Sequence, residues 1–390
     1  MNQRNFGLDL LRSISIFLVF MSHLHLIFPP DGRMQQISMF FSVIDGVTIF
    51  FVLSGFLVGY RLIELFNNPA LVTNGGLSVF LISRWCKTLP SYYVILFLLL
   101  LLRRQYISEN NIPIEAYAFF IQNFNTNHPA FFEEAWSLSV EEWFYLTVPL
   151  LLTLLIKVFN CSVRTSFLII CVAVLSISHL TRFFLSQGID TVSFWDFGMA
   201  IRGRVIARID APIYGAVFAY YYYYYPLHFK KNRFKSLLIC GLLLVIQLMV
   251  TLSVYTTIDL KNSVIGEHRT LCVFFGFFYF DIAQACAAFC IPWLFYIGIR
   301  WRLTKAAVTF VSKVSYSIYL VHSSLVIGAC LPFISYHYFG SMYFGGGHKL
   351  LLLSTYLALV TITTLLLYYF VEMPFFRAKK RWMKRLKDAS

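Results

Sequence analysis

The chain has 390 residues, of which 59% are hydrophobic and 18% aromatic, while only 13% are charged. Soluble domains contain about 45–50% apolar and about 25% charged residues, so this chain has too little polar surface to cover its apolar mass in water. The composition therefore excludes a soluble protein and predicts a polytopic membrane protein. The net charge of +14 does not indicate a nucleic-acid partner, because the cations lie between apolar segments rather than on one continuous face.

The apolar segments predict an all-α fold. A membrane-spanning helix needs about 20 mostly apolar residues, and ten segments meet this requirement. They cover 10–29, 38–60, 82–102, 137–157, 166–185, 208–226, 236–256, 271–299, 307–331 and 350–371. We therefore expect a helical bundle of about ten transmembrane helices in one membrane domain, 1–376, followed by a basic tail, 377–390. An even number of spans places both termini on one side, and the connections on that side hold about two thirds of the Lys and Arg residues, which predicts that it is cytoplasmic.

Ionisable side chains inside spans are costly unless they face a cavity or a partner, so they are the first functional candidates. Arg12 and His23 both lie in the first span. At about 100° and 1.5 Å per residue they should project from one face, about 16 Å apart along the axis, with Arg12 nearer the cytoplasm. Alternatively, Arg12 could be a cation at a helix end that reaches the interface, and His23 a structural histidine.

The predicted topology brings further polar residues to the non-cytoplasmic level of His23. Asp45 opens the second span and Glu141 the fourth, Arg208 and Asp210 open the sixth, and His322 lies in the outer half of the ninth. We expect these groups to line an acceptor cleft that opens outwards. His322 could instead pack the ninth span through hydrogen bonds to its neighbours.

Arg84 and Lys87 are predicted at the other level, near the depth of Arg12. Cations of this kind suit the phosphates of a nucleotide-bearing cofactor. At the outer level, a histidine beside carboxylates supplies a base that takes a proton from an alcohol. The eight cysteines lack the C-x2-C spacing of a zinc or redox site, so we expect no metal site.

At these residues the sequence resembles the acyltransferase family 3 of integral membrane acyltransferases. Five segments carry the resemblance in chain order: the Arg-x10-His spacing of Arg12 and His23, the block Asp45–Phe56, the block Trp136–Tyr145 with Glu141 and Tyr145, the block Ser315–His322, and the closing Val371–Pro374. The family's Arg-x-x-Arg motif before the third span reads Arg84-Trp85-Cys86-Lys87 here, so the second cation is kept but lacks the bidentate fork of arginine.

The resemblance implies a membrane O-acyltransferase of the bacterial inner membrane. Its donor would be acyl-CoA, most simply acetyl-CoA. Its acceptor would be a hydroxyl of a cell-surface glycan or lipid-linked glycan, such as lipopolysaccharide O-antigen or exopolysaccharide, at the periplasmic side. The implied site residues are His23, Glu141 and Asp45 for catalysis, with His23 as base or transient acyl carrier; Arg12, Arg84 and Lys87 for the donor; and Arg208, Asp210, His322 and Tyr145 for the acceptor.

Two other functions fit the same charges. A transporter or flippase for a glycan intermediate would use them to line a permeation path, although no internal repeat is visible. A structural membrane subunit would leave the cost of so many buried charges unexplained. Some members of the resembled family carry a soluble SGNH-type domain after the last span, and none is expected here. Membrane lipids are the remaining predicted partners.

Overall fold

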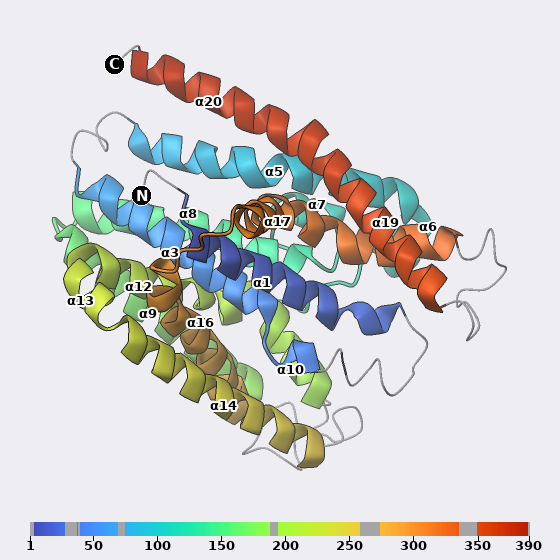
Figure 1. The fold of residues 1–390 in the computed structure, drawn as a ribbon, viewed down its shortest axis with the longest axis horizontal. Helices are drawn as coiled ribbons and strands as arrows, with labels where there is room; N and C mark the ends of the chain where they lie inside the picture. The colour runs from blue at the N-terminus through green and yellow to red at the C-terminus, as the bar shows by residue number, and fades with distance from the viewer. Residues whose placement is uncertain are drawn as a thin grey trace.

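The computed structural model describes residues 4–27, 37, 40–68, 75–187, 194–257, 274–334 and 349–388. Within these ranges every regular element is a helix and none is a strand, which confirms the all-α fold class. The predicted span ends at 28–29, 38–39 and 271–273, and the tail residues 389–390, lie outside the described residues. The helices form one elongated bundle (Figure 1).

The longer helices are α1 (Phe6–Ser22), α3 (Gly46–Phe66), α5 (Gly76–Leu102), α8 (Ala135–Lys157), α9 (Val163–Ser186), α12 (Ala211–Tyr224), α14 (Arg233–Thr257), α16 (Phe280–Phe295), α17 (Arg302–Val321), α19 (Lys349–Leu367) and α20 (Met373–Asp388). The shorter elements are η1 (Leu24–Leu26), α6 (Arg104–Asn110), α7 (Ile114–Ala118), α10 (Phe194–Gly203), α11 (Val205–Arg208) and α13 (Pro226–Lys231). Three wider, π-helical turns are η3 (Phe275–Tyr279), η4 (His322–Cys330) and η5 (Tyr368–Glu372).

Nine helical stretches of the described residues are long and apolar enough to cross a membrane, and they correspond to nine of the ten predicted spans. The predicted span 208–226 differs, because the helix is interrupted after Arg208 and restarts as α12. Pro212 in the first turn of α12 lacks a backbone N–H, so it fits the start of a helix better than its interior. The 14 residues of α12 measure about 21 Å, less than the hydrocarbon core of about 30 Å.

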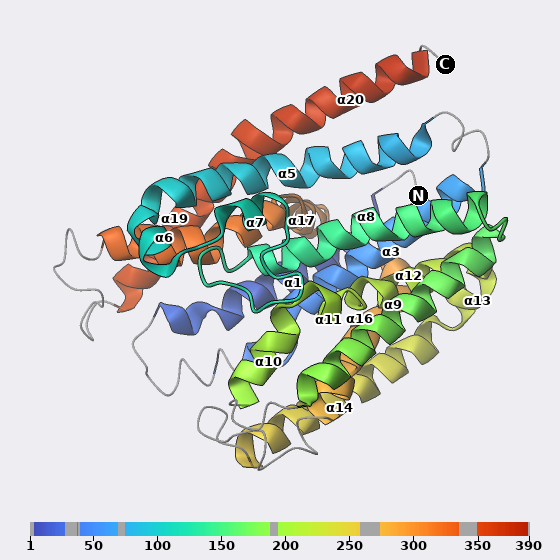
Figure 2. The same cartoon turned by 180° about the vertical axis from the view of Figure 1, so that it is seen from behind.

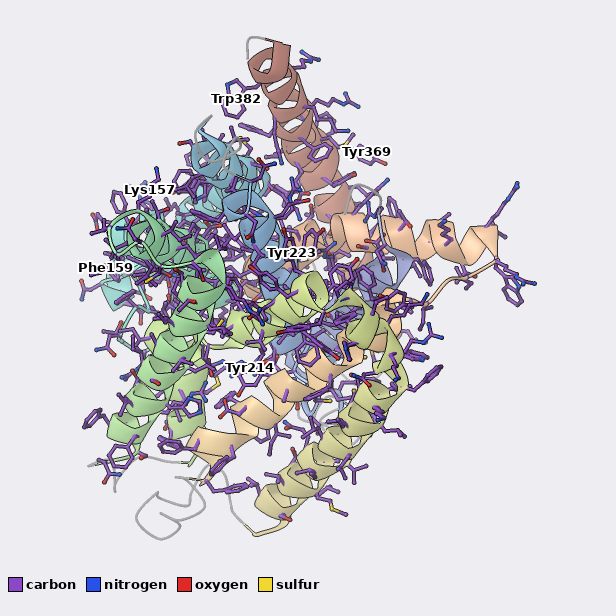
Figure 3. The ribbon with its side chains drawn as sticks, turned by 90° about the vertical axis from the view of Figure 1, so that its left-hand side faces the viewer. Lys157, Phe159, Tyr214, Tyr223, Tyr369 and Trp382 are labelled. Atoms are coloured by element: carbon purple, nitrogen blue, oxygen red, sulfur yellow. The ribbon has the colours of Figure 1, made fainter. Side chains whose placement is uncertain are left out.

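The short helix α12 packs directly against α3. A Cβ atom at Gly55 of α3 would overlap the carbonyl oxygen of Pro212, and one at Gly59 would press on Ala216. Since these pairs follow the same order along both helices, α3 and α12 run parallel. Small residues that let backbones touch are the usual means of tight helix association in membranes. In the view along the bundle, Tyr223 of α12 accordingly lies near its middle (Figure 3).

The first and last described helices end on the same side of the bundle. Figures 1 and 2 show the start of α1 and the end of α20 at one end. The predicted basic tail is helical as far as Asp388, within α20. It lies along α5, where the Lys379 ammonium donates to the Ser83 carbonyl oxygen at 3.1 Å. Trp382 marks this helix at the edge of the bundle in Figure 3.

We predict that Gly55→Ala destabilises the bundle, because the new methyl group forces α3 and α12 apart. Overpacking of this kind costs about 1–3 kcal/mol. Gly241→Ala is the matched control, since a Cβ there has no neighbouring atom within 4 Å and alanine is the better helix former. Thermal unfolding of the two purified variants in detergent is the measurement. Equal loss of stability in both would contradict the α3–α12 contact.

Candidate active site

Helix α1 runs beside α17 and η4. It carries Arg12 at the predicted cytoplasmic level and His23 at the predicted outer level. The Arg12 guanidinium lies 3.4 Å from the Ser312 hydroxyl of α17, and the His23 ring lies edge-on to the His322 ring of η4, with centroids 5.0 Å apart. Arg12 and His23 therefore face the same neighbouring helix, which confirms their predicted common face. His23 is the C-cap of α1 rather than a residue within the helix.

The inner level is a cluster of three cations and two carboxylates, which we call the basic cluster: Arg12, Arg84, Lys87, Glu141 and Glu372. Lys87 interacts electrostatically with all four of the others. Its side chain is exposed. The predicted meeting of Arg12 with the two cations of α5 is thus present in the structure.

The structure corrects the expected depth of Glu141. We expected it at the start of the fourth span, beside His23, whereas α8 begins at Ala135. Six further residues carry Glu141 about 9 Å along the axis into the bundle, to the level of Lys87. The helix start, which the apolar pattern placed only approximately, decides which cluster this carboxylate joins.

Tyr145 follows Glu141 to the basic cluster. Its hydroxyl donates to Glu141 Oε2 at 2.9 Å and lies 2.5 Å from the Ser54 hydroxyl. The Arg84 guanidinium carbon lies 5.6 Å from the centre of its ring. The structure therefore places Tyr145 at the level predicted for the donor, not at the level predicted for the acceptor.

The outer level contains two adjacent imidazoles with the same hydrogen-bonding pattern. Nδ1 of His23 lies 2.7 Å from the Val19 carbonyl oxygen, and Nδ1 of His322 lies 2.7 Å from the Tyr319 carbonyl oxygen. A carbonyl oxygen only accepts, so each Nδ1 carries the proton and each neutral ring has its lone pair on Nε2. Nε2 of His322 is buried without a hydrogen-bond partner among the described residues. Each ring can therefore accept a proton at Nε2.

Two acidic residues that the motif analysis did not single out lie beside these rings. Glu134 Oε1 is 3.9 Å from Nδ1 of His322, and Glu133 interacts electrostatically with His23. Burial raises the pKa of Glu134 to about 7. The only sequence signal for them is a pair of carboxylates directly before the apolar part of the fourth span. We refer to His23, His322, Glu133 and Glu134 as the histidine cluster.

Glu134 also fixes the start of η4. Its carboxylate accepts from the backbone N–H groups of Ser323 at 3.0 Å and Ser324 at 2.8 Å, and from the Ser324 hydroxyl. Widened π-helical turns are frequent at functional sites. The contact joins the beginning of α8 to the turn that carries His322.

Asp45 opens the second span as predicted, as the N-cap of α3. Its carboxylate accepts from the Val47 N–H at 3.1 Å and the Thr48 hydroxyl at 2.9 Å. It also pairs with Arg202 at 3.3 Å, and that guanidinium acts electrostatically on His23. Asp45 therefore lies near the outer level, with Arg202 as its partner.

The structure places Arg208 and Asp210 differently from the predicted outward-opening cleft, because both are fully buried. Arg208 donates to the Thr48 hydroxyl at 2.7 Å, and Asp210 pairs with Arg182 of α9. Arg182 also binds Asp281 of α16 at 3.1 Å. The low dielectric of the bundle interior favours such pairing. These charges form a network that joins helices, and sequence patterns could not pair them across about a hundred residues.

Among the described residues, no group of three or more His, Cys, Asp or Glu side chains is arranged to hold a metal ion.

Comparison with known proteins defines the class. The acyltransferase domain family matches the chain over residues 5–372. The chain therefore belongs to this family, which confirms the resemblance seen in the sequence, and it is a multi-pass membrane protein.

Two relatives from Staphylococcus aureus, of strains COL and MSSA476, are each named "Putative O-acetyltransferase". Each is 26% identical to the chain over 196 residues. The match covers 47% of this chain and 30% of each relative, so it spans less than a third of the length of these curated relatives. No solved structure matches the chain.

We predict that Glu134→Ala destabilises the protein, because two N–H groups of η4 lose their acceptor. The expected loss is about 1–3 kcal/mol for each unsatisfied group. Glu134→Gln should be close to the parent protein, since its amide oxygen can still accept both bonds. Thermal unfolding of both variants tests this, and similar melting temperatures for the two would show that the contact is not needed.

Proposed function

We propose that this protein is an O-acetyltransferase that takes an acetyl group from acetyl-CoA on the cytoplasmic side and transfers it to a glycan hydroxyl on the periplasmic side of a bacterial inner membrane. The observation that carries the proposal is the placement of Arg12 and His23 on one face of α1, each within its own cluster. The names of the relatives support acetyl as the group transferred.

The basic cluster is the proposed site for the donor. Arg12, Arg84 and Lys87 would bind the phosphates of CoA, Arg84 through its planar fork and Lys87 as a point charge. Their distance from His23 suits a donor whose reactive thioester lies at the end of a long, slender arm. Binding by the phosphates would then place the acetyl group near the imidazoles.

The histidine cluster is the proposed site of chemistry. In the direct route, Nε2 of His23 takes the proton of the acceptor hydroxyl while its oxygen attacks the thioester carbonyl carbon. The C–S bond then breaks, and the CoA thiolate receives the proton from His23. Glu133 favours the imidazolium that forms between these steps. In the alternative route, Nε2 of His23 attacks the thioester carbonyl carbon, and the C–S bond breaks to release the CoA thiolate. The acceptor hydroxyl oxygen then attacks the acetyl group on Nε2, the N–C bond breaks, and the hydroxyl proton goes to the CoA thiolate.

The proposed acceptor is a hydroxyl of a surface glycan, such as lipopolysaccharide O-antigen, exopolysaccharide or a lipid-linked intermediate. Arg202 and Arg204 support an acidic or phosphate-bearing acceptor, since both lie on the side where topology disfavours cations. Arg202 is half-buried next to Trp136, with its guanidinium carbon 5.4 Å from that ring. Aromatic and guanidinium groups together form a suitable surface for an anionic sugar.

We predict that His23→Ala abolishes glycan acetylation while the protein still inserts and folds. His25→Ala is the matched control, because His25 is exposed and bonds the Ser22 carbonyl oxygen two residues from the proposed base. Loss of a general base typically costs about 10²–10⁴-fold in rate. Acetyl transfer from radiolabelled acetyl-CoA to host glycans, with thermal unfolding of both variants, provides the measurement. Near-parent transfer by His23→Ala at equal protein level would refute the assignment.

We predict that Arg84→Ala weakens acetyl-CoA binding by about 1.5–3 kcal/mol, the usual value of a charged hydrogen bond. Lys87→Arg should bind at least as tightly as the parent, because it restores a second bidentate fork. Titration of the purified protein with CoA by calorimetry measures both. Arg164→Ala is the control, as this exposed cation stacks on tyrosines of α12 instead. Unchanged CoA affinity in an Arg84/Lys87 double alanine variant would place the donor elsewhere.

A further inference from the structure

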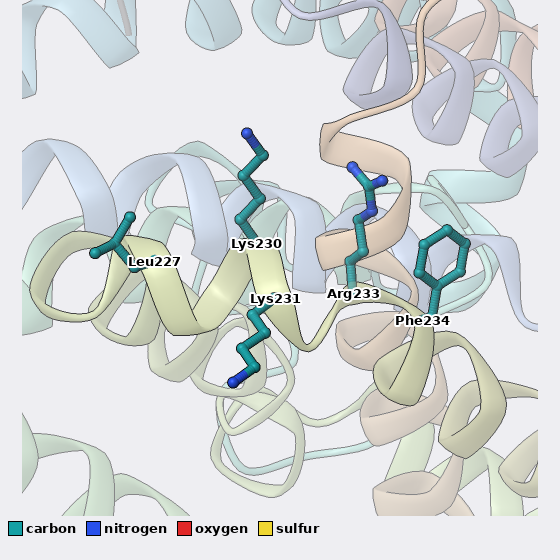
Figure 4. Close-up of a pocket in the computed structure, with 5 residues that line it drawn as sticks. All are labelled: Leu227, Lys230, Lys231, Arg233 and Phe234. Carbon is teal, nitrogen blue, oxygen red and sulfur yellow. The ribbon is translucent and has the colours of Figure 1, made fainter.

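Two cavities lie at the corner between α12, α13 and α14. The residues that line them belong to neither the basic cluster nor the histidine cluster. One, of about 340 Å³, is lined by Leu227, Lys230, Lys231, Arg233 and Phe234. Figure 4 shows Lys230 and Arg233 on one side of this corner and Lys231 on the other. The second, of about 430 Å³, is lined by Val217, Phe218, Tyr221, Asn232, Lys235, Ser236, Ile239 and Phe289.

Four cations lie close together in the sequence at this corner. None of the ion pairs formed by the described residues includes Lys230, Lys231, Arg233 or Lys235. Arg233 and Lys235 lie in the first turn of α14, where the helix dipole is positive and disfavours cations. An anion bound at this corner would reduce the repulsion among the cations. It would also interact favourably with the positive end of the α14 dipole.

An apolar groove continues from these charges into the bundle surface. Asn232, just before α14, is followed at helical spacing by Lys235 and Ile239 on one stripe of that helix, so the groove changes from polar to apolar over about 10 Å. Val217 and Phe218 of α12 form its opposite wall. α14 lies at the edge of the bundle in Figure 1, and its remaining surface is exposed and apolar.

We propose that this corner is a binding site for an anionic phospholipid, with the phosphate beside the cations at the start of α14 and one acyl chain in the groove. Basic pockets beside transmembrane helices on the cytoplasmic side bind such headgroups, and each cation near the surface contributes favourably. The apolar wall distinguishes this ligand from free phosphate, which has nothing to place against Val217 and Ile239. The site is separate from the basic cluster proposed for CoA, and it does not depend on the acetyl-transfer proposal.

Native mass spectrometry of the purified full-length chain tests the site. The detergent-solubilised protein is titrated with phosphatidylglycerol and with phosphatidylcholine of the same acyl chains. The parent protein should prefer the anionic lipid. Lys231→Gln/Lys235→Gln should reduce that preference by about fivefold for each cation removed. Arg302→Gln/Lys305→Gln, which removes two exposed cations from the start of α17, should leave the preference unchanged.

Two further measurements test which part of the phospholipid is recognised. Ile239→Trp fills the groove and should lower phosphatidylglycerol occupancy while all four cations remain. Glycerophosphoglycerol, the headgroup without chains, and inorganic phosphate should not displace the lipid. Equal binding of the two lipids by the parent, equal losses in both double variants, full occupancy in Ile239→Trp, or displacement by inorganic phosphate would each overturn the proposal.

Discussion

The fixed rise of α1 between Arg12 and His23 sets the geometry on which both clusters depend. α17 and η4 run alongside in the same direction, so Ser312 meets Arg12 and His322 meets His23. Two rigid helices, rather than loops, therefore hold the cations and the imidazoles apart. A ligand bound at one level can react at the other only if its reactive group lies on a long arm, which is the shape of an acyl-CoA.

The charged residues inside the bundle form two groups with different surroundings. Two cations, Arg182 and Arg208, interact with two carboxylates, Asp210 and Asp281, and all of these residues except Asp281 have no exposed surface. Such a network satisfies its own charges and leaves none for a ligand. The basic cluster differs in exposure, because Lys87 is exposed there while Arg12 also pairs with the buried Asp9 at 3.9 Å. This difference in exposure separates the fully buried charges that join helices from those proposed to bind a donor.

Sequence patterns predicted which residues share a face of one helix better than they predicted the level at which a residue lies in the bundle. Helical spacing was enough to place Arg12 and His23 on one side of α1, because that relation lies within one element. The level of Glu141 depends on where α8 begins, and the observed start at Ala135 lies two residues, or about 3 Å, before the start of the predicted span. Glu134 and Asp281 acquire their partners from helices far along the chain. Only the packed bundle brings those pairs together, so no local pattern contains them.

The two imidazoles share a tautomer but differ in surroundings. His23 caps the end of α1 and is half-buried, so an acceptor hydroxyl can reach it, whereas His322 is fully buried in η4. A positive charge on His23 is opposed by burial and by Arg202 and is favoured by Glu133. Glu134 holds the turn that carries His322 through two backbone N–H groups. The widened turn η4 therefore positions the buried ring against the accessible one, and the accessible ring is the better placed to exchange a proton with substrate.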